Sequence, residues 1–482
     1  MSETTLLKTG LAYLVPLGWA LIAIGGLPEE RAHRAVLAFM AAFCLSTIGY
    51  FAVGFALQFG GVGLAHAMPG LEDLVWEWSA FGATWGAGWG MAGLSGWALS
   101  GPAATPGAMT LAMANLPWVI TATLIPVIAL RGRVPAWGAG ILGIAVGAVL
   151  YPVVGNWIWG GGWLANLGSN LGYGRGLVDL GGSGLVHLLG GTVTLAGLLV
   201  FTERAPAPAI RTALTSFPPV HLPLLATLGA GMLLAGSVAW SAGNPLLGAD
   251  SGHLTHLALN TVLAAAAGSF LPLCYSWFVA GTVDPMMAVR GFAAGTVAIA
   301  AGAPLVPPWF ALATGGCAGL LVLLAIFVVD RVLRWEDCTA ALTVNGLAGA
   351  LGLLAVGVFA AVMPGDLRAI GGMPGSSSVP VSGIGQIQAQ LAGALAIALF
   401  AFMGAWVLIA PPAILAGWAR GGLTRVPDGE VPALAVGSSS QPEASSDTEN
   451  VPERSSEGLA EALSTRTVLA PDGSSELLSV ED

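Results

Sequence analysis

The sequence predicts an all-α, polytopic membrane protein with about 11 transmembrane helices and an inverted five-helix repeat. Two observations predict the membrane class. Of the 482 residues, 55% are hydrophobic and only 9% are charged, and apolar runs of 18 or more residues recur along the chain. A soluble domain of this composition could not cover its surface with polar groups. A third observation, two similar polar patterns five helices apart, predicts the repeat.

Each apolar run is long enough for a helix to cross about 30 Å of hydrocarbon, where a helix satisfies its own backbone hydrogen bonds. We expect the spans near residues 9–26, 36–58, 106–130, 136–158, 180–202, 220–243, 254–280, 288–303, 307–330, 338–363 and 387–418.

Arginines between these spans predict the orientation, because cytoplasmic loops retain Lys and Arg. If the amino terminus is outside, the inside loops hold nine arginines and the outside loops hold only Arg175 and Arg368. The inside set is Arg31, Arg34, Arg131, Arg133, Arg204, Arg211, Arg290, Arg331 and Arg334. We therefore expect a multi-pass protein of the cell membrane with a cytoplasmic carboxyl terminus.

The charge separates two regions, a membrane domain at 1–425 and a tail at 426–482. The tail carries 12 acidic residues against Arg454 and Arg466, which accounts for the whole net charge of −10. It has too few large apolar residues to build a core, so we expect a disordered, acidic cytoplasmic tether. A regulatory role for the tail is the alternative.

Several function classes are not indicated. The chain has no strand-borne Gly-rich phosphate loop, nucleophile elbow or zinc pattern, and no basic stripe for nucleic acid. Its four cysteines lack C-x-x-C spacing, so they predict neither a disulfide nor a metal site. We expect no enzymatic activity, no cofactor, no metal and no nucleic-acid partner.

The repeated polar pattern places two residues near the middle of the bilayer. His187 follows Asp179 by eight residues, and Asn345 follows Asp337 by the same interval. Eight residues of helix span about 12 Å. Because the two segments enter from opposite faces, both His187 and Asn345 should lie near the midplane and within about 4 Å of each other. A polar residue at this depth marks a transport path or, alternatively, a packing contact between helices.

The two aspartates are expected to be structural residues near this path. A carboxylate at the start of a helix accepts backbone N–H groups and suits the positive end of the helix dipole. Two tryptophans are candidates for the mouth of the path, Trp159 before three glycines and Trp240 in the sixth span. An aromatic face attracts a small cation, although either tryptophan taken alone is better explained as an interfacial anchor.

Along residues 10–426 the chain carries ordered motifs spread over most of the spans. They are Gly49-Tyr50 with Phe59-Gly60, Ala129 to Trp137, Tyr151 with Trp159-Gly-Gly-Gly, Asp179 to His187 with Gly190 and Gly191, Ala239-Trp-Ser-Ala-Gly-Asn244, and Asn260-Thr261. With these motifs the chain resembles the Amt/Mep/Rh ammonium transporter family. The resemblance implies a homotrimer with one narrow hydrophobic pore per subunit, an outer aromatic site for ammonium, two gating phenylalanines and two hydrogen-bonded histidines.

The chain departs from the family pattern at the pore itself. Asn345 stands at the second histidine position, and Asn244 stands where the family has the outer serine. An asparagine still offers a carbonyl oxygen to a cation. Without gaps, the two gate phenylalanines fall on Leu116 and Trp240, and Trp118 is close enough to substitute if the helix bulges.

The resemblance therefore predicts a channel-like carrier of ammonium or ammonia in the lipid bilayer. The alternatives are a membrane ammonium sensor, in which the altered pore binds but hardly conducts, and a channel for a neutral gas such as CO₂. A cytoplasmic regulatory protein is a further potential partner.

Overall fold

The computed structural model describes residues 3–27, 29–82, 85, 88–131, 134, 136–201, 222–246, 251–335, 337, 339–362 and 383–419. The predicted tail at 426–482 lies outside these residues. Parts of the loops at 202–221 and 363–382, which carry three of the arginines used for the orientation, also lie outside them.

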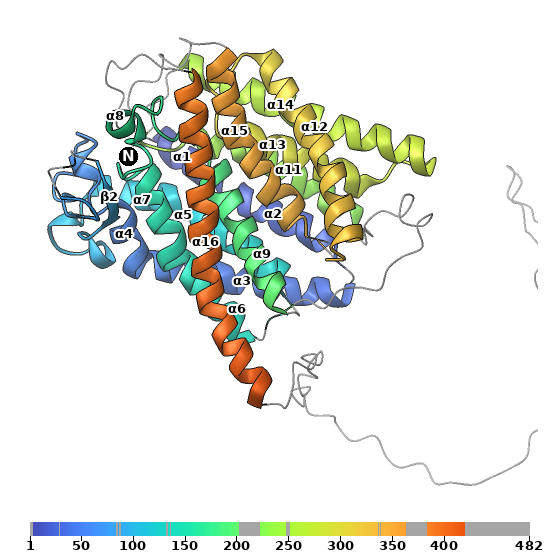
Figure 1. The fold of residues 1–482 in the computed structure, drawn as a ribbon, viewed down its shortest axis with the longest axis horizontal. Helices are drawn as coiled ribbons and strands as arrows, with labels where there is room; N and C mark the ends of the chain where they lie inside the picture. Colours follow the sequence, from blue (N-terminus) through green and yellow to red (C-terminus); the bar gives the residue numbers. More distant parts are fainter. Residues whose placement is uncertain are drawn as a thin grey trace, which may run out of the picture. The chain divides into compact units, whose positions relative to one another are not determined.

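The described residues contain the eleven helical segments that the sequence predicts (Figure 1). Ten are long and apolar enough to cross a membrane, and the eleventh, Pro285–Ala300, is shorter. In chain order the segments are α1 (Glu3–Ala12) with α2 (Leu14–Gly25); α3 (Glu29–Gly49) with η1 (Tyr50–Gly54) and α4 (Phe55–Phe59); α5 (Pro106–Ala129); α6 (Ala136–Ala145) with η6 (Val146–Leu150) and α7 (Tyr151–Ile158); η7 (Ser183–Leu188) with α9 (Leu189–Phe201); α11 (Pro223–Ala242); α12 (Ser251–Ala280); α13 (Pro285–Ala300); α14 (Pro308–Ile326) with η8 (Phe327–Val332); η9 (Ala341–Gly346) with α15 (Leu347–Val362); and α16 (Gly383–Ala419).

Shorter elements lie in the connections. Between α4 and α5 a two-stranded antiparallel sheet, which the sequence does not predict, pairs Glu77 with Gly93. The short elements are η2 (Val62–Leu64), β1 (Glu77–Ser79), β2 (Gly90–Gly93), η4 (Trp97–Leu99), η5 (Gly101–Ala103) and α8 (Leu167–Leu171).

Small residues let the helices approach closely, as is usual where lipid provides no hydrophobic drive for association. A β-carbon on Gly18 of α2 would lie 2.6 Å from the carbonyl oxygen of Gly229 of α11. At the crossing of α9 and η9, a β-carbon on Gly191 would overlap the backbone of Gly346. The close approach of Gly191 and Gly346 brings the two polar segments that contain His187 and Asn345 together.

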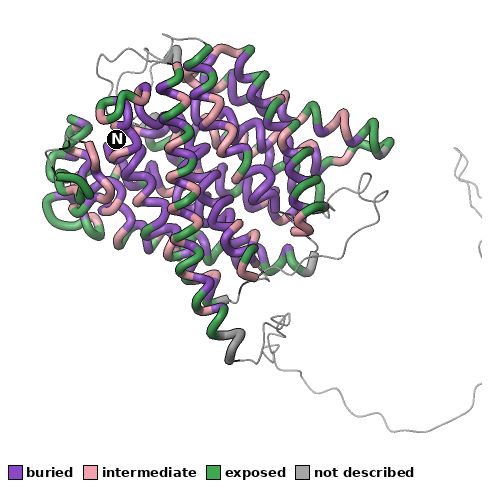
Figure 2. The backbone as a smooth tube through the Cα atoms, viewed as in Figure 1, coloured by how far each residue is buried: buried purple, intermediate pink, exposed green. Residues whose placement is uncertain are grey.

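The outside of the bundle is apolar. Figure 2 shows the exposed residues on the outward sides of the peripheral helices and the buried ones between helices. Among the exposed side chains are Leu224, which is 81% exposed, and Leu399, which is 64% exposed. In water such a surface would be unstable, so it is the surface of a protein that faces lipid. The fold is therefore that of a multi-pass membrane protein.

Candidate functional site at the crossing of the two polar segments

The two polar segments have the same local structure. Each starts after a residue in the left-handed conformation, Gly182 (φ 77°) and Ala340 (φ 58°), and continues as six residues of π-helix, η7 and η9. A π-turn is rare and often marks a functional site. The left-handed conformation is costly for alanine, so the surrounding structure must hold Ala340 in place. The sequence shows the repeated Asp-to-polar spacing but not the π-turns.

The structure brings His187 and Asn345 together as the sequence predicts. Nδ1 of His187 lies 2.7 Å from Oδ1 of Asn345, and the two side chains are 4% and 1% exposed. The amide nitrogen of Asn345 donates to the carbonyl of Ala340 at 3.2 Å, which places the amide oxygen toward the histidine. His187 must then carry its proton on Nδ1 and donate it to that oxygen. Its Nε2 is left as an acceptor, with no hydrogen-bond partner among the described residues.

The aspartates cap the π-turns, as the sequence predicts for structural residues. Oδ2 of Asp179 accepts the backbone N–H groups of Gly184 and Leu185, each at 2.9 Å. Burial raises the pKa of the Asp179 carboxyl to about 6, while these N–H groups lower it. The two N–H groups therefore favour the carboxylate form of Asp179 against the effect of burial.

Asp337 caps the second π-turn with more bonds. Its two oxygens accept the N–H groups of Ala341, Leu342 and Thr343 at 2.8 to 3.0 Å, and the Thr343 hydroxyl donates to Oδ2 at 2.9 Å. The Arg290 guanidinium donates to the carbonyl oxygen of Asp337 at 2.7 Å. Both aspartates therefore bind backbone and are 4% exposed or less.

Removal of the Asp179 carboxylate should destabilise the fold more than it weakens substrate binding. Asp179→Ala leaves two buried N–H groups without an acceptor, which should lower the free energy of unfolding by about 2 kcal/mol. Asp179→Asn keeps one acceptor oxygen and should have a smaller effect. Thermal unfolding in detergent, together with KM for methylammonium uptake by the folded fraction, measures both.

The matched control is Asp73→Ala, which removes an exposed aspartate between α4 and α5. It should leave the midpoint of unfolding unchanged. A folded, normally stable Asp179→Ala protein with altered selectivity would instead place Asp179 in the substrate path.

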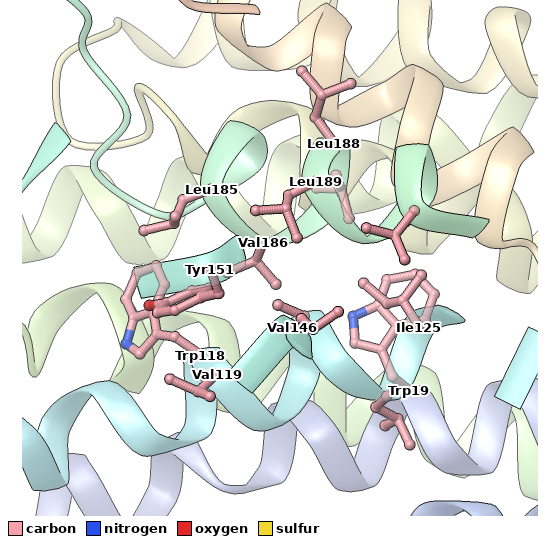
Figure 3. Close-up of a cluster of buried hydrophobic side chains, with 14 of the residues drawn as sticks. Trp19, Trp118, Val119, Ile125, Val146, Tyr151, Leu185, Val186, Leu188 and Leu189 are labelled. Carbon is pink, nitrogen blue, oxygen red and sulfur yellow. The ribbon is translucent and has the colours of Figure 1, made fainter. Parts of the chain in front are cut away.

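Three tryptophans meet beside the start of the histidine segment, where a β-carbon on Gly182 would contact the ring of Trp118. The ring centroid of Trp118 lies 3.9 Å from that of Trp240, with the planes tilted by 39°, and 4.6 Å from that of Trp159, edge to face. Nε1 of Trp159 donates to the backbone carbonyl of Asp179 at 2.9 Å, which fixes the ring beside η7. Figure 3 shows Trp118 near Tyr151, with Leu185 and Val186 of η7 close to Tyr151. Trp118 thus joins Trp159 and Trp240 in one tryptophan cluster.

Trp118, and not Leu116, is the partner of Trp240. Leu116 is partly buried and packs against the hydrophobic core. Two residues correspond to about 200° around a helix, so Leu116 and Trp118 point in nearly opposite directions. Pro117, which stands between them, removes one backbone hydrogen bond inside α5.

Two further predicted site residues, Asn244 and Tyr151, are buried and already form hydrogen bonds within the protein. Oδ1 of Asn244 accepts the backbone N–H of Leu246 at 3.1 Å, so this oxygen already has one donor, while Nδ2 is buried without a partner among the described residues. The Tyr151 hydroxyl donates to Oδ1 of Asn115 at 3.3 Å. Tyr151 therefore belongs to a polar network and lies beside the tryptophan cluster.

Sequence reasoning missed several residues near the site. Gln58 and Asn115 join the network of Tyr151, because Nε2 of Gln58 donates to Asn115 at 3.3 Å and the Tyr50 hydroxyl donates to Gln58 at 2.8 Å. Both amides lie inside predicted spans, where a polar side chain is costly and marks a functional position, as for His187. Trp19 of α2 is the other missed residue, with its ring centroid 5.7 Å from that of His187.

The site holds no candidate metal centre in the part of the chain that is described. Within those ranges no group of three or more His, Cys, Asp or Glu side chains could hold a metal ion. The chemistry that the arrangement offers is a neutral imidazole acceptor beside a fixed amide, enclosed by aromatic and aliphatic side chains. Such a site can hydrogen-bond a small polar molecule and exclude a hydrated ion.

Comparisons with known proteins give the family. The profile of the Ammonium Transporter Family matches residues 4–415. Ammonium transporter Amt2 of Archaeoglobus fulgidus is 29% identical over 352 residues, which cover 73% of this chain and 69% of the relative. A putative ammonium transporter of Synechocystis, sll1017, is 34% identical over 50% of this chain and 53% of its own length.

Solved structures show the same fold. A structure titled Sensor Amt Protein has a TM-score of 0.67 and 22% identity, and covers 86% of this chain and 93% of its own. Mep2 of Candida albicans has a TM-score of 0.67 and 20% identity, and covers 86% of this chain and 84% of its own. With the profile match over most of the chain, these findings show that the protein belongs to the Ammonium Transporter Family.

Proposed function

We propose that this protein carries ammonium nitrogen across a cell membrane, one unit at a time, along a path past the tryptophan cluster and the His187–Asn345 pair. The observation that carries the proposal is the buried hydrogen bond between His187 and Asn345. It joins two segments of opposite direction and leaves one imidazole nitrogen free to accept a hydrogen bond. Ammonium as the substrate is supported by the curated relatives that bear the name ammonium transporter.

The tryptophan cluster is the proposed recruitment site. The faces of Trp159, Trp118 and Trp240 attract a small cation through the ring quadrupole, by about 2 kcal/mol where water is excluded. A second oxygen lone pair of Asn244 can accept a hydrogen bond from the cation. Na⁺ and K⁺ bind less well because apolar side chains cannot replace their hydration shells.

The His187–Asn345 pair then binds the neutral NH₃ molecule. After NH₄⁺ gives one proton to solvent water at the entrance of the path, the remaining NH₃ donates a hydrogen bond to Nε2 of His187, while Asn345 holds the imidazole in the required tautomer. An amide does not titrate, so Asn345 cannot pass a proton to or from His187. The proposed cycle therefore moves NH₃ past the pair without a proton relay between the two residues.

The remaining assignments are part of the proposal. The protein resides in the plasma membrane as a homotrimer, with its amino terminus outside and its carboxyl terminus in the cytoplasm, where a regulatory protein is a candidate partner. The arginine distribution supports the orientation. Family membership supports the trimer.

Uptake of radiolabelled methylammonium into a transport-deficient host tests the function. The wild-type protein should raise uptake above background, and His187→Ala should lower it by about tenfold, the factor that corresponds to one lost hydrogen bond of about 1.4 kcal/mol. His256→Ala is the matched control, because His256 is an exposed histidine on α12. It should transport like the wild type.

Other outcomes separate the alternatives. Background uptake together with measurable ammonium binding would support a sensor. Background uptake together with faster CO₂-driven acidification of proteoliposomes would support a gas channel.

A further inference from the structure

Trp19 presents a buried hydrogen-bond donor in a ring that contacts the imidazole of His187. Its side chain is 3% exposed, and its ring centroid lies 5.7 Å from that of His187, with the planes tilted by 54°. The indole Nε1–H is buried and has no acceptor among the described residues. In Figure 3 the ring enters the apolar cluster near Val146 and Ile125, which offer no acceptor.

A buried N–H without an acceptor is costly, so an indole in this position needs an explanation. Two other tryptophans in the described residues, Trp163 and Trp240, also have a buried, unpartnered Nε1. Their rings contact those of Trp157 and Trp118, respectively. Among these three, Trp19 is in ring contact with the histidine of the polar pair.

We propose that Trp19 is a specificity-determining residue of the path, whose indole N–H donates a hydrogen bond to the lone pair of NH₃ beside His187. The assignment rests on the proposed function. Nε2 of His187 offers only an acceptor, and the indole of Trp19 offers only a donor. A molecule that contacts both must therefore donate to the imidazole and accept from the indole.

This pair of groups discriminates by chemistry as well as by size. NH₃ has three N–H donors and one lone pair, so it satisfies both residues. NH₄⁺ has no lone pair, and the positive end of the indole N–H dipole repels it. CO₂ accepts hydrogen bonds but has none to donate to His187. Among the three candidate substrates, only NH₃ matches the two residues together.

Trp19→Phe tests the assignment, because it keeps an aromatic ring and removes the N–H. In proteoliposomes that contain the full-length protein, a trapped pH dye reports NH₃ entry and a solid-supported membrane reports ammonium-evoked current. We expect the NH₃ flux to fall by about tenfold and the ratio of current to NH₃ flux to rise. A purely structural role would lower both signals together and leave their ratio unchanged.

Trp163→Phe is the matched control, since it also removes an unpartnered indole N–H and should leave flux and ratio unchanged. If Trp19→Phe does not fold, β-(3-benzothienyl)alanine at position 19 keeps the shape of the indole and replaces N–H by sulfur. An unchanged flux and ratio in either folded variant, with an active wild type, would overturn the role of Trp19. A wild type without NH₃ flux would instead overturn the proposed function.

Discussion

Asn345→His should raise the ammonium-evoked current of the reconstituted protein by about a hundredfold, the lower end of the range that a positioned proton-transfer group contributes. In the native protein Nδ1 of His187 donates a hydrogen bond to the Asn345 amide oxygen at 2.7 Å. The amide does not titrate, so it cannot take up the proton of the imidazole. A second imidazole supplies one nitrogen that accepts while the other donates. The variant would then contain a titratable chain across the midplane.

Asn345→Gln is the matched control for this experiment. Glutamine approaches the volume of histidine but does not titrate, so it separates the effect of size from that of proton transfer. Current measured on a solid-supported membrane should rise in Asn345→His and stay at or below the wild-type level in Asn345→Gln. A large native current that Asn345→His leaves unchanged would show that charge crosses by another route and that His187 acts by shape and hydrogen bonding.

The sequence predicts most of the fold because the bilayer restricts the options. A run of about 20 apolar residues in hydrocarbon has to form a helix, so hydropathy alone locates the eleven spans. The shortest, α13, was expected at 288–303 and begins at Pro285, where Asp284 caps it by accepting the N–H of Met287 at 2.9 Å. The His187–Asn345 contact was predictable for a related reason, since a repeated Asp-to-polar spacing defines depth in the membrane.

Other parts of the site depend on packing that a sequence does not display. The π-turns η7 and η9 are invisible to a helical periodicity argument, because they shift a side chain around the axis without a change in composition. A gap-free comparison selects Leu116, whereas the ring that meets Trp240 belongs to Trp118. The sequence indicates the role of Trp19 only in part. Its position inside the first span, Leu6–Gly25, argues against an interfacial anchor, but its contact with His187 is tertiary.

Gly191→Ala should destabilise the protein by about 3 kcal/mol, because overpacking of a close helix crossing forces backbone shifts. The added β-carbon would overlap backbone atoms of Gly346, and backbone cannot rotate away as a long side chain can. Alanine otherwise favours a helix over glycine by about 1 kcal/mol, so the loss has to exceed that gain. The crossing also sets the distance between η7 and η9, so methylammonium uptake by any folded fraction should fall as well.

Two alanine substitutions control for the helical preference. On Gly346, across the same crossing, a β-carbon would come no closer than 3.6 Å to another atom, which is ordinary van der Waals contact. On Gly231 of α11 it would meet nothing within 4 Å. Thermal unfolding in detergent should show both proteins at or above the wild-type midpoint and Gly191→Ala well below it. If Gly191→Ala and Gly346→Ala unfold alike, the two helices can separate at this point, and the His187–Asn345 contact does not depend on their close approach.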